Sequence, residues 1–209
     1  TLHLQNGGFV IIPGISVANA SGGGGGGTYP TGSVFCASGA TTIVDVTNPT
    51  TGAIWMDRNL GASQAATSST DVDAYGDLYQ WGRRADGHQC RTSALTANLS
   101  TIDQPAHANS TLRITAPYAS RSPQNTNLWQ GVNGVNNPCP SGYRIPTELE
   151  LDAERLSWST QNSAGAIASP LKLPMTGKRE ITNGSVPGLA SYGTYWSSTV
   201  STFLIEDIY

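Results

Sequence analysis

Three aspartates close together in the sequence have the spacing that a cation site can use. Asp71, Asp73 and Asp77 could supply carboxylate oxygens to a Ca²⁺ ion from a loop. Their spacing does not fit an EF-hand, and carboxylates near the start of a helix are also favoured by the helix dipole. Both interpretations, a calcium site and a helix start, stay open, and no other metal or cofactor is expected.

A second group is a thiol beside an imidazole. Cys90 follows His88 by two positions, as in a nucleophile and its base, but no orienting motif surrounds them, and His3 and His107 lie elsewhere. The sequence has no Gly-x-Ser-x-Gly or His-Glu-x-x-His motif. Gly22–Gly27 matches a phosphate-binding pattern only trivially, with no periodic helix after it. We therefore expect no catalytic residue and no enzymatic activity.

The cysteines predict one disulfide and one buried thiol. Cys36, Cys90 and Cys139 allow a single internal bridge, whose pairing stays open. No Cys-x-x-Cys spacing occurs, so a zinc site is not expected. The odd number fits an oxidising compartment only if the third cysteine is buried or pairs outside the chain.

The composition points to an extracellular location. Only 12% of the 209 residues are charged, while 24 are Gly, 22 Ser and 23 Thr. The net charge is −3 and the longest basic run is Arg83-Arg84, so nucleic acid is not an expected partner. No apolar run is long enough for a membrane span. Thr1 is not a start methionine, so a processed, secreted product is expected. The Asn-x-Ser/Thr sequences that begin at Asn98, Asn109 and Asn183 are candidate glycosylation sites.

The chain divides into three parts. Residues 1–20 are expected to form an extended, β-branched leader that is separate from the rest, and residues 21–28 a flexible polyglycine tether. Residues 29–209 form the main domain. The apolar residues of the leader are Phe9, Val10, Ile11, Ile12, Ile15 and Val17.

One helix is clearly predicted in the main domain, over residues 146–158. Thr147 and Glu150 have the spacing of a capping box. The apolar face of this helix is predicted to consist of Leu149, Ala153 and Leu156. A short helix is expected within 71–81, long loops over 84–138, and strands at 34–36, 42–46, 53–56, 171–175 and 191–199.

Four ordered motifs, at 52–62, 75–83, 138–147 and 195–199, resemble the Fibrobacter succinogenes major paralogous domain of bacterial surface proteins. The stretch from Arg144 into the helix is also similar to the sulfatase-modifying-factor group, which includes the formylglycine-generating enzymes. The resemblance implies an α+β, β-rich, C-type-lectin-like domain. The motif residues expected to have structural roles are Trp55, Asp57, Arg58, Trp81, Arg144, Pro146 and Trp196. Asp57, Arg58 and Asp77 are expected to form a buried polar network.

Two departures from these families bear on function. The enzyme relatives act through cysteines near the C-terminal part of the domain, and none follows Cys139 here, so oxidase activity is not implied. Members of the paralogous domain continue to a closing cysteine, so the partner of Cys139 and the last strands are expected to be missing.

These features lead to a hypothesis of strand exchange. Each leader would enter the groove of a neighbouring copy, giving a head-to-tail extracellular, pilus-like filament. The alternative is a surface adhesin or carbohydrate-binding module, with loops 84–138 and 157–170 as its contact surface, or a virion receptor-binding domain.

Overall fold

The structure, a computed structural model, describes residues 2–5, 16–18, 27–111, 121–180 and 182–200. Of the six apolar residues predicted for the leader, Val17 is within this part. The other five lie outside the described residues: Phe9, Val10, Ile11, Ile12 and Ile15.

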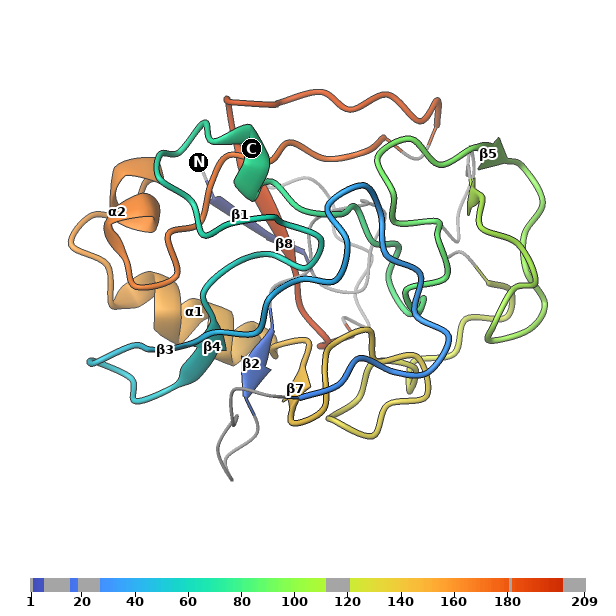
Figure 1. Ribbon diagram of the computed structural model, residues 1–209, viewed down its shortest axis with the longest axis horizontal. Coiled ribbons are helices and arrows are strands. Elements are labelled where there is room, and N and C mark those ends of the chain that lie inside the picture. Colours follow the sequence, from blue (N-terminus) through green and yellow to red (C-terminus); the bar gives the residue numbers. More distant parts are fainter. Residues whose placement is uncertain (1, 6–15, 19–26, 112–120, 181, 201–209) are drawn as a thin grey trace.

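The described residues form short strands and helices joined by long loops (Figure 1). The strands are β1 (Leu2–Gln5), β2 (Val17–Ala18), β3 (Asp45–Thr47), β4 (Ile54–Met56), β5 (Leu95–Thr96), β6 (Ser110–Thr111), β7 (Tyr143–Arg144) and β8 (Gly193–Trp196). The helices are a 3₁₀ turn at Val72–Ala74, α1 (Glu148–Leu156) and α2 (Ser163–Ala168). The predicted α+β class is therefore confirmed in this general sense.

Three small open sheets organise the residues that the structure describes. The largest has the strand order β3-β4-β2-β7, and its neighbouring strands β3/β4, β4/β2 and β2/β7 are antiparallel. β1 pairs in parallel with β8, and β5 pairs in parallel with β6. Figure 1 shows β2 between β4 and β7, with α1 lying against this sheet.

Helix α1 begins as predicted but has a different buried face. The capping box is present: Thr147 accepts from the Glu150 backbone N–H, and the Glu150 carboxylate accepts from the Thr147 N–H. The predicted apolar face is wrong, because Leu149 and Leu156 are 81% and 66% exposed. Leu151 and Glu154 face the core instead.

The burial of Glu154 has a local cause. Its carboxylate accepts hydrogen bonds from the Asn48 amide at 2.5 Å and from the Trp158 indole at 3.1 Å. A buried carboxylate with such partners is tolerated. These hydrogen bonds of Glu154 fix the rotation of α1 about its axis, so that Leu149 and Leu156 face solvent.

Other predicted elements are shorter than expected. The helix expected within 71–81 is the single 3₁₀ turn, capped by Asp71. The strand at 42–46 is reduced to β3, and the residues at 34–36 and 171–175 form loops. Helix α2, which Asn162 caps, was not predicted; it lies within the 157–170 segment interpreted as a loop.

Two apolar clusters form the core within the described ranges. One is built around three tryptophans, Trp81, Trp129 and Trp196. The ring centroid of Trp129 lies 5.6 Å from that of Trp81 and 6.1 Å from that of Trp196. The other contains Val17 and Trp55 together with residues that follow β7. Trp55, Trp81 and Trp196 are core residues, as predicted.

Candidate functional site

The strand β2 fills a slot between two strands that are distant in sequence. Val17 lies opposite Trp55 of β4 on one side and Arg144 of β7 on the other. Val17 is 2% exposed and Trp55 is fully buried, in the same apolar cluster as Leu151 of α1. A two-residue strand therefore completes both the largest sheet and the core beneath it.

The residue before β2 binds the slot through polar groups. The Ser16 carbonyl accepts from the Met56 N–H at 3.0 Å, and the Ser16 hydroxyl donates to the Cys139 sulfur at 3.0 Å. Both Ser16 and Cys139 are almost completely buried. Burial raises the pKa of the Cys139 thiol to about 12, so this cysteine stays protonated and weakly nucleophilic at neutral pH.

The β7 side of the slot is stiffened by a motif predicted from the sequence. The Arg144 guanidinium donates to both carboxylate oxygens of Glu150, at 2.8 and 2.5 Å. Burial opposes ionisation of Glu150, but the hydrogen bonds from Arg144 and Thr147 outweigh it and lower the pKa of Glu150. Pro146 lies just before the N-cap, and its carbonyl accepts from the Ser198 N–H. These contacts connect β7, α1 and the segment after β8.

The two ends of the glycine-rich tether lie close together. Ala18, at the end of β2, pairs with Tyr143. Thr28, just past the glycine run, exchanges hydrogen bonds with Ser141, two positions before Tyr143. The nine intervening residues, 19–27, can span about 30–32 Å when extended. The tether is therefore far longer than the connection within one chain requires.

The leader was expected to be separate from the main domain, and its described parts are not. Residues 2–5 pair with β8, and residues 16–18 lie in the largest sheet of the same chain. The physical reason is that β4 and β7 each leave an unpaired edge facing the slot, and the tether keeps the leader at a high effective concentration beside it.

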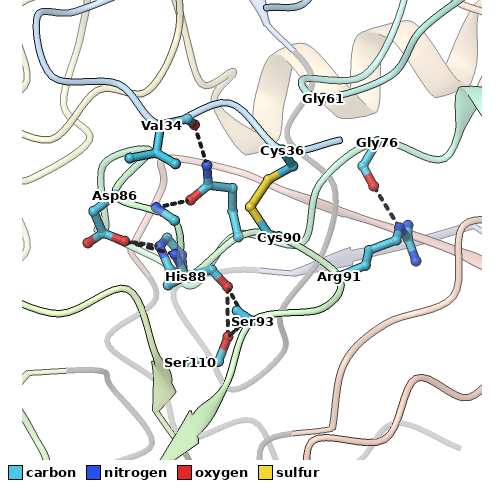
Figure 2. The surroundings of a disulfide bond; sticks show 12 residues. Val34, Cys36, Gly61, Gly76, Asp86, His88, Cys90, Arg91, Ser93 and Ser110 are labelled. Atoms are coloured by element: carbon cyan, nitrogen blue, oxygen red, sulfur yellow. Dashed lines mark hydrogen bonds and ion pairs between the residues drawn. A yellow bond between two sulfur atoms is a disulfide. The ribbon is translucent and has the colours of Figure 1, made fainter. Parts of the chain in front are cut away.

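The disulfide joins Cys36 and Cys90, with a Cα–Cα distance of 5.4 Å (Figure 2). Cys139 is free and buried, which confirms the prediction of one bridge and one buried thiol. Because Cys90 is bridged, it cannot form a nucleophilic pair with His88.

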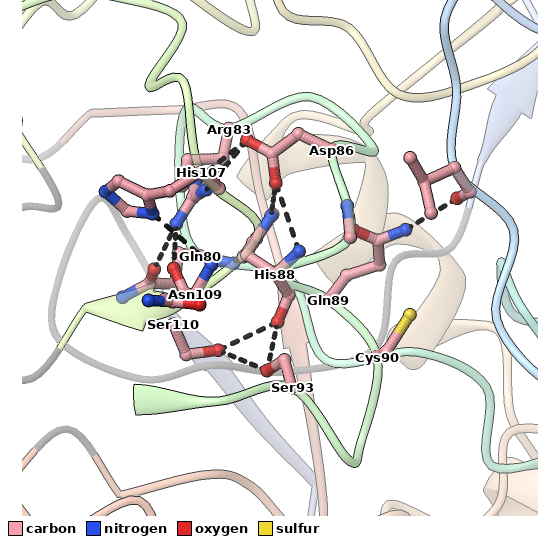
Figure 3. A network of polar contacts seen from close by, with 12 residues as sticks. Gln80, Arg83, Asp86, His88, Gln89, Cys90, Ser93, His107, Asn109 and Ser110 are labelled. Atoms are coloured by element: carbon pink, nitrogen blue, oxygen red, sulfur yellow. Dashed lines mark hydrogen bonds and ion pairs between the residues drawn. The ribbon is translucent and has the colours of Figure 1, made fainter. Parts of the chain in front are cut away.

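His88 belongs instead to a buried polar network (Figure 3). Its Nδ1 lies 2.7 Å from the Asp86 carboxylate, and its Nε2 accepts from the Gln80 N–H at 2.9 Å. Burial lowers the pKa of His88 to about 4, so the ring is neutral. Arg83 donates to the same Asp86 carboxylate and to loop carbonyls of residues 107 and 109. The network holds the 84–111 loops together and leaves its histidine without a free basic nitrogen.

The predicted network of Asp57, Arg58 and Asp77 is only partly present. Asp57 and Arg58 form a half-buried ion pair at 2.7 Å, and Arg58 also reaches the Ser63 carbonyl. Asp77 packs instead against Gly61, where a Cβ atom would lie 2.2 Å from the Asp77 carboxyl carbon, so the missing side chain of the glycine leaves room for the carboxyl. Burial raises the pKa of Asp77 to about 7, and the charge of Arg91 opposes this effect.

The three aspartates do not converge on a common point. The Asp71 carboxylate caps the 3₁₀ turn and accepts from Thr67 and Gln64. Asp73 and Asp77 line a pocket of about 160 Å³ near the disulfide. Within the described ranges no group of three or more His, Cys, Asp or Glu residues could hold a metal ion.

The three candidate glycosylation sites differ in exposure. Asn98 and Asn183 are exposed, whereas Asn109 is half-buried and is followed by the buried Ser110 and Thr111. The Asn183 side-chain oxygen accepts from the Ser185 N–H and hydroxyl.

A second surface feature, which we call the aromatic groove, is formed by residues between 27 and 43. It has a volume of about 610 Å³, is open to solvent, and has no charged residue in its lining. The rings of Tyr29 and Phe35 meet edge to face in it, with centroids 5.2 Å apart. Neither this groove nor the contact of Ser16 with Cys139 was predicted, because neither has a local sequence signature.

Comparison with protein-family models, with curated proteins and with solved structures yields no match for the chain. None of the helices in the described ranges is long and apolar enough to cross a membrane. The function is therefore argued from the slot itself.

Proposed function

We propose that the protein is a non-enzymatic structural subunit of an extracellular bacterial filament, in which the leader of each copy fills the slot of the next. The domain would have the C-type-lectin-like fold that its motifs suggest. The proposal is carried by one observation: a two-residue strand completes the largest sheet and its core from the end of a long glycine-rich tether.

The contacts of the slot can be made equally well from outside the chain. A neighbour's Val17 would meet the same Trp55 and Arg144 and lose the same surface to solvent. Burying a valine side chain stabilises by about 1.5–3 kcal/mol, whichever copy supplies it. Exchange between copies therefore conserves the contact energy.

The balance between the closed monomer and the filament is then set by effective concentration. A short flexible tether presents its own strand at about millimolar concentration. Exchange is favoured where the protein is locally concentrated, as at a secretion or assembly site. Because one leader enters one slot in a head-to-tail manner, the product is an open chain of subunits.

Cys139 offers a direct test of this proposal. In the Ser16→Cys variant a second thiol would lie beside Cys139, where the hydroxyl now lies 3.0 Å from the sulfur. Oxidation of concentrated protein with copper–phenanthroline is expected to give a ladder of covalent oligomers on non-reducing gels. Monomers that lose both free thiols without forming a ladder would contradict the proposal.

Two matched variants control this experiment. Ser16→Ala and the double variant Ser16→Cys/Cys139→Ser retain the Cys36–Cys90 bridge but lack the new pair. Neither is expected to give a ladder, so a ladder from either one would mean that the cross-links form elsewhere.

A further inference from the structure

The aromatic groove presents a partly exposed phenylalanine ring beside Tyr29, which itself packs against the tryptophan cluster of the core. Phe35 is 42% exposed, and the half-buried Tyr29 supports its ring from the side. Tyr29 is fixed in turn, because its hydroxyl donates to the Thr41 carbonyl at 3.0 Å. An exposed aromatic ring held in a defined orientation is typical of binding surfaces.

The frame of the groove is rigid on both sides. The disulfide of Cys36 (Figure 2) follows Phe35 directly. The Val34 N–H donates to the Ala85 carbonyl at 2.7 Å, and the Val34 carbonyl accepts from the Gln89 side chain at 2.8 Å. At the other end, Thr28 is bound to Ser141. The ring of Phe35 is thus pre-positioned, which lowers the entropic cost of binding.

The lining of the groove indicates the chemistry of its ligand. It contains no charged residue, which disfavours anionic or cationic ligands. Its lining includes the exposed residues Thr28 and Thr42, whose hydroxyls make no hydrogen bond within the described part of the chain. An apolar aromatic face beside free hydroxyls matches a sugar ring, which has an apolar C–H face and a rim of hydroxyls.

We propose that the aromatic groove binds a neutral carbohydrate, with one sugar ring packed on Phe35 and its hydroxyls bonded to Thr28 and Thr42. The groove lies within the size range of small-molecule sites. It differs from the loops at 84–138 and 157–170 that the sequence suggested as a contact surface. It does not depend on strand exchange, because Val17 and Ser16 are not among its lining residues.

The test uses the full chain on an array of neutral glucose, mannose, galactose and N-acetylglucosamine oligomers, with sialylated and sulfated glycans beside them. Binding of at least one neutral oligomer is expected, with an affinity that Phe35→Ala lowers about tenfold and Phe35→Trp retains. Val135→Ala, which removes a 66% exposed apolar side chain outside the groove, should leave it unchanged.

Thermal unfolding of each variant shows whether it is folded. If Phe35→Ala does not fold, the glycan binding of Phe35→Trp still tests the proposal. Silence of the array, binding only of charged glycans, or equal binding by a folded Phe35→Ala variant would overturn the proposal. The Ser16→Cys ladder should be the same with and without Phe35→Ala, so failure of the groove and failure of the filament can be told apart.

Discussion

Asp77 and His88 are buried ionisable residues whose effects on stability oppose each other as the pH changes. Burial raises the pKa of Asp77 to about 7 and lowers that of His88 to about 4. Between the usual value of 3.8 and about 7, the folded protein keeps a proton on Asp77 that the unfolded chain has lost, so stability falls as pH rises. Between about 4 and the usual 6.5, the folded protein lacks a proton on His88 that the unfolded chain holds, so stability rises.

The variant Asp77→Asn should separate the two effects. The amide has no charge to bury, so at pH 8 the variant is expected to be more stable than the wild type, by as much as about 4 kcal/mol. Its stability should rise from pH 4.5 to 7, because His88 and, at the acid end of this range, Glu150 bind fewer protons in the folded protein than in the unfolded chain. Urea unfolding at several pH values measures this. The exposed Asp73→Asn, from the same pocket, is the control and should change little; an equal loss of stability for Asp77→Asn at every pH would contradict the account.

The types of the residues predict which of them are buried, but not which distant residues they contact. The core positions of Trp55, Trp81 and Trp196 follow from their size and apolar character. The contact of Ser16 with Cys139 could not be predicted, since the two residues are 123 positions apart and neither belongs to a local pattern. The same holds for Asp77, which was grouped with Asp57 and Arg58 but is packed against Gly61.

At the scale of elements, α1 shows how a correct helix prediction can have the wrong face. The capping box specifies where a helix begins, and it does so here. The apolar spacing of Leu149 and Leu156 predicted the buried side, but the hydrogen bonds of Glu154 to Asn48 and Trp158 determine it instead. A tertiary polar contact has overridden the helical periodicity.

This rotation can be tested with two leucines of the same helix. Leu151→Ala should lower the free energy of unfolding by about 2–5 kcal/mol, because Leu151 is 2% exposed. Leu149→Ala removes the same atoms from an 81% exposed position and should change it by less than about 0.5 kcal/mol. Denaturant unfolding of both variants gives the comparison, and equal losses would mean that the leucine stripe faces the core.

The length of the glycine-rich tether is expected to control assembly. Deleting residues 23–26 leaves five residues, 19–22 and 27, between Ala18 and Thr28, and these extend to about 17–18 Å. This length still joins Ala18 to Thr28 within one chain, because their partners Tyr143 and Ser141 are two positions apart. The reach to a neighbour is roughly halved.

Shortened chains should therefore unfold at the wild-type temperature but form far fewer oligomers, as size-exclusion chromatography at high protein concentration would show. Replacing the same four glycines by serine keeps the length and is the matched control. If the shortened chain assembles as well as the serine variant, the length of the tether has no role in assembly.

At the scale of the whole molecule, the class of fold was predictable but the position of the leader was not. Alternating strand and turn patterns with one capped helix indicate an α+β domain, and this is what the sheets and α1 form. Nothing in the residues 1–20 shows which edges they pair with, since β4 and β7 are distant in sequence. The sheet exists only when these three segments meet, so its completion is a property of the folded molecule.

If the slot of one copy receives the leader of another, isotope mixing will show that the residues at positions 16 and 139 of each cross-link come from different chains. Isotopically heavy and light Ser16→Cys chains would be mixed, assembled at high concentration and oxidised, and the disulfide-linked peptides containing residues 16 and 139 analysed by mass spectrometry. The account predicts peptide pairs with one heavy and one light partner, in proportion to random mixing. Pairs in which both peptides always carry the same label would contradict it, because the leader would then serve only its own chain.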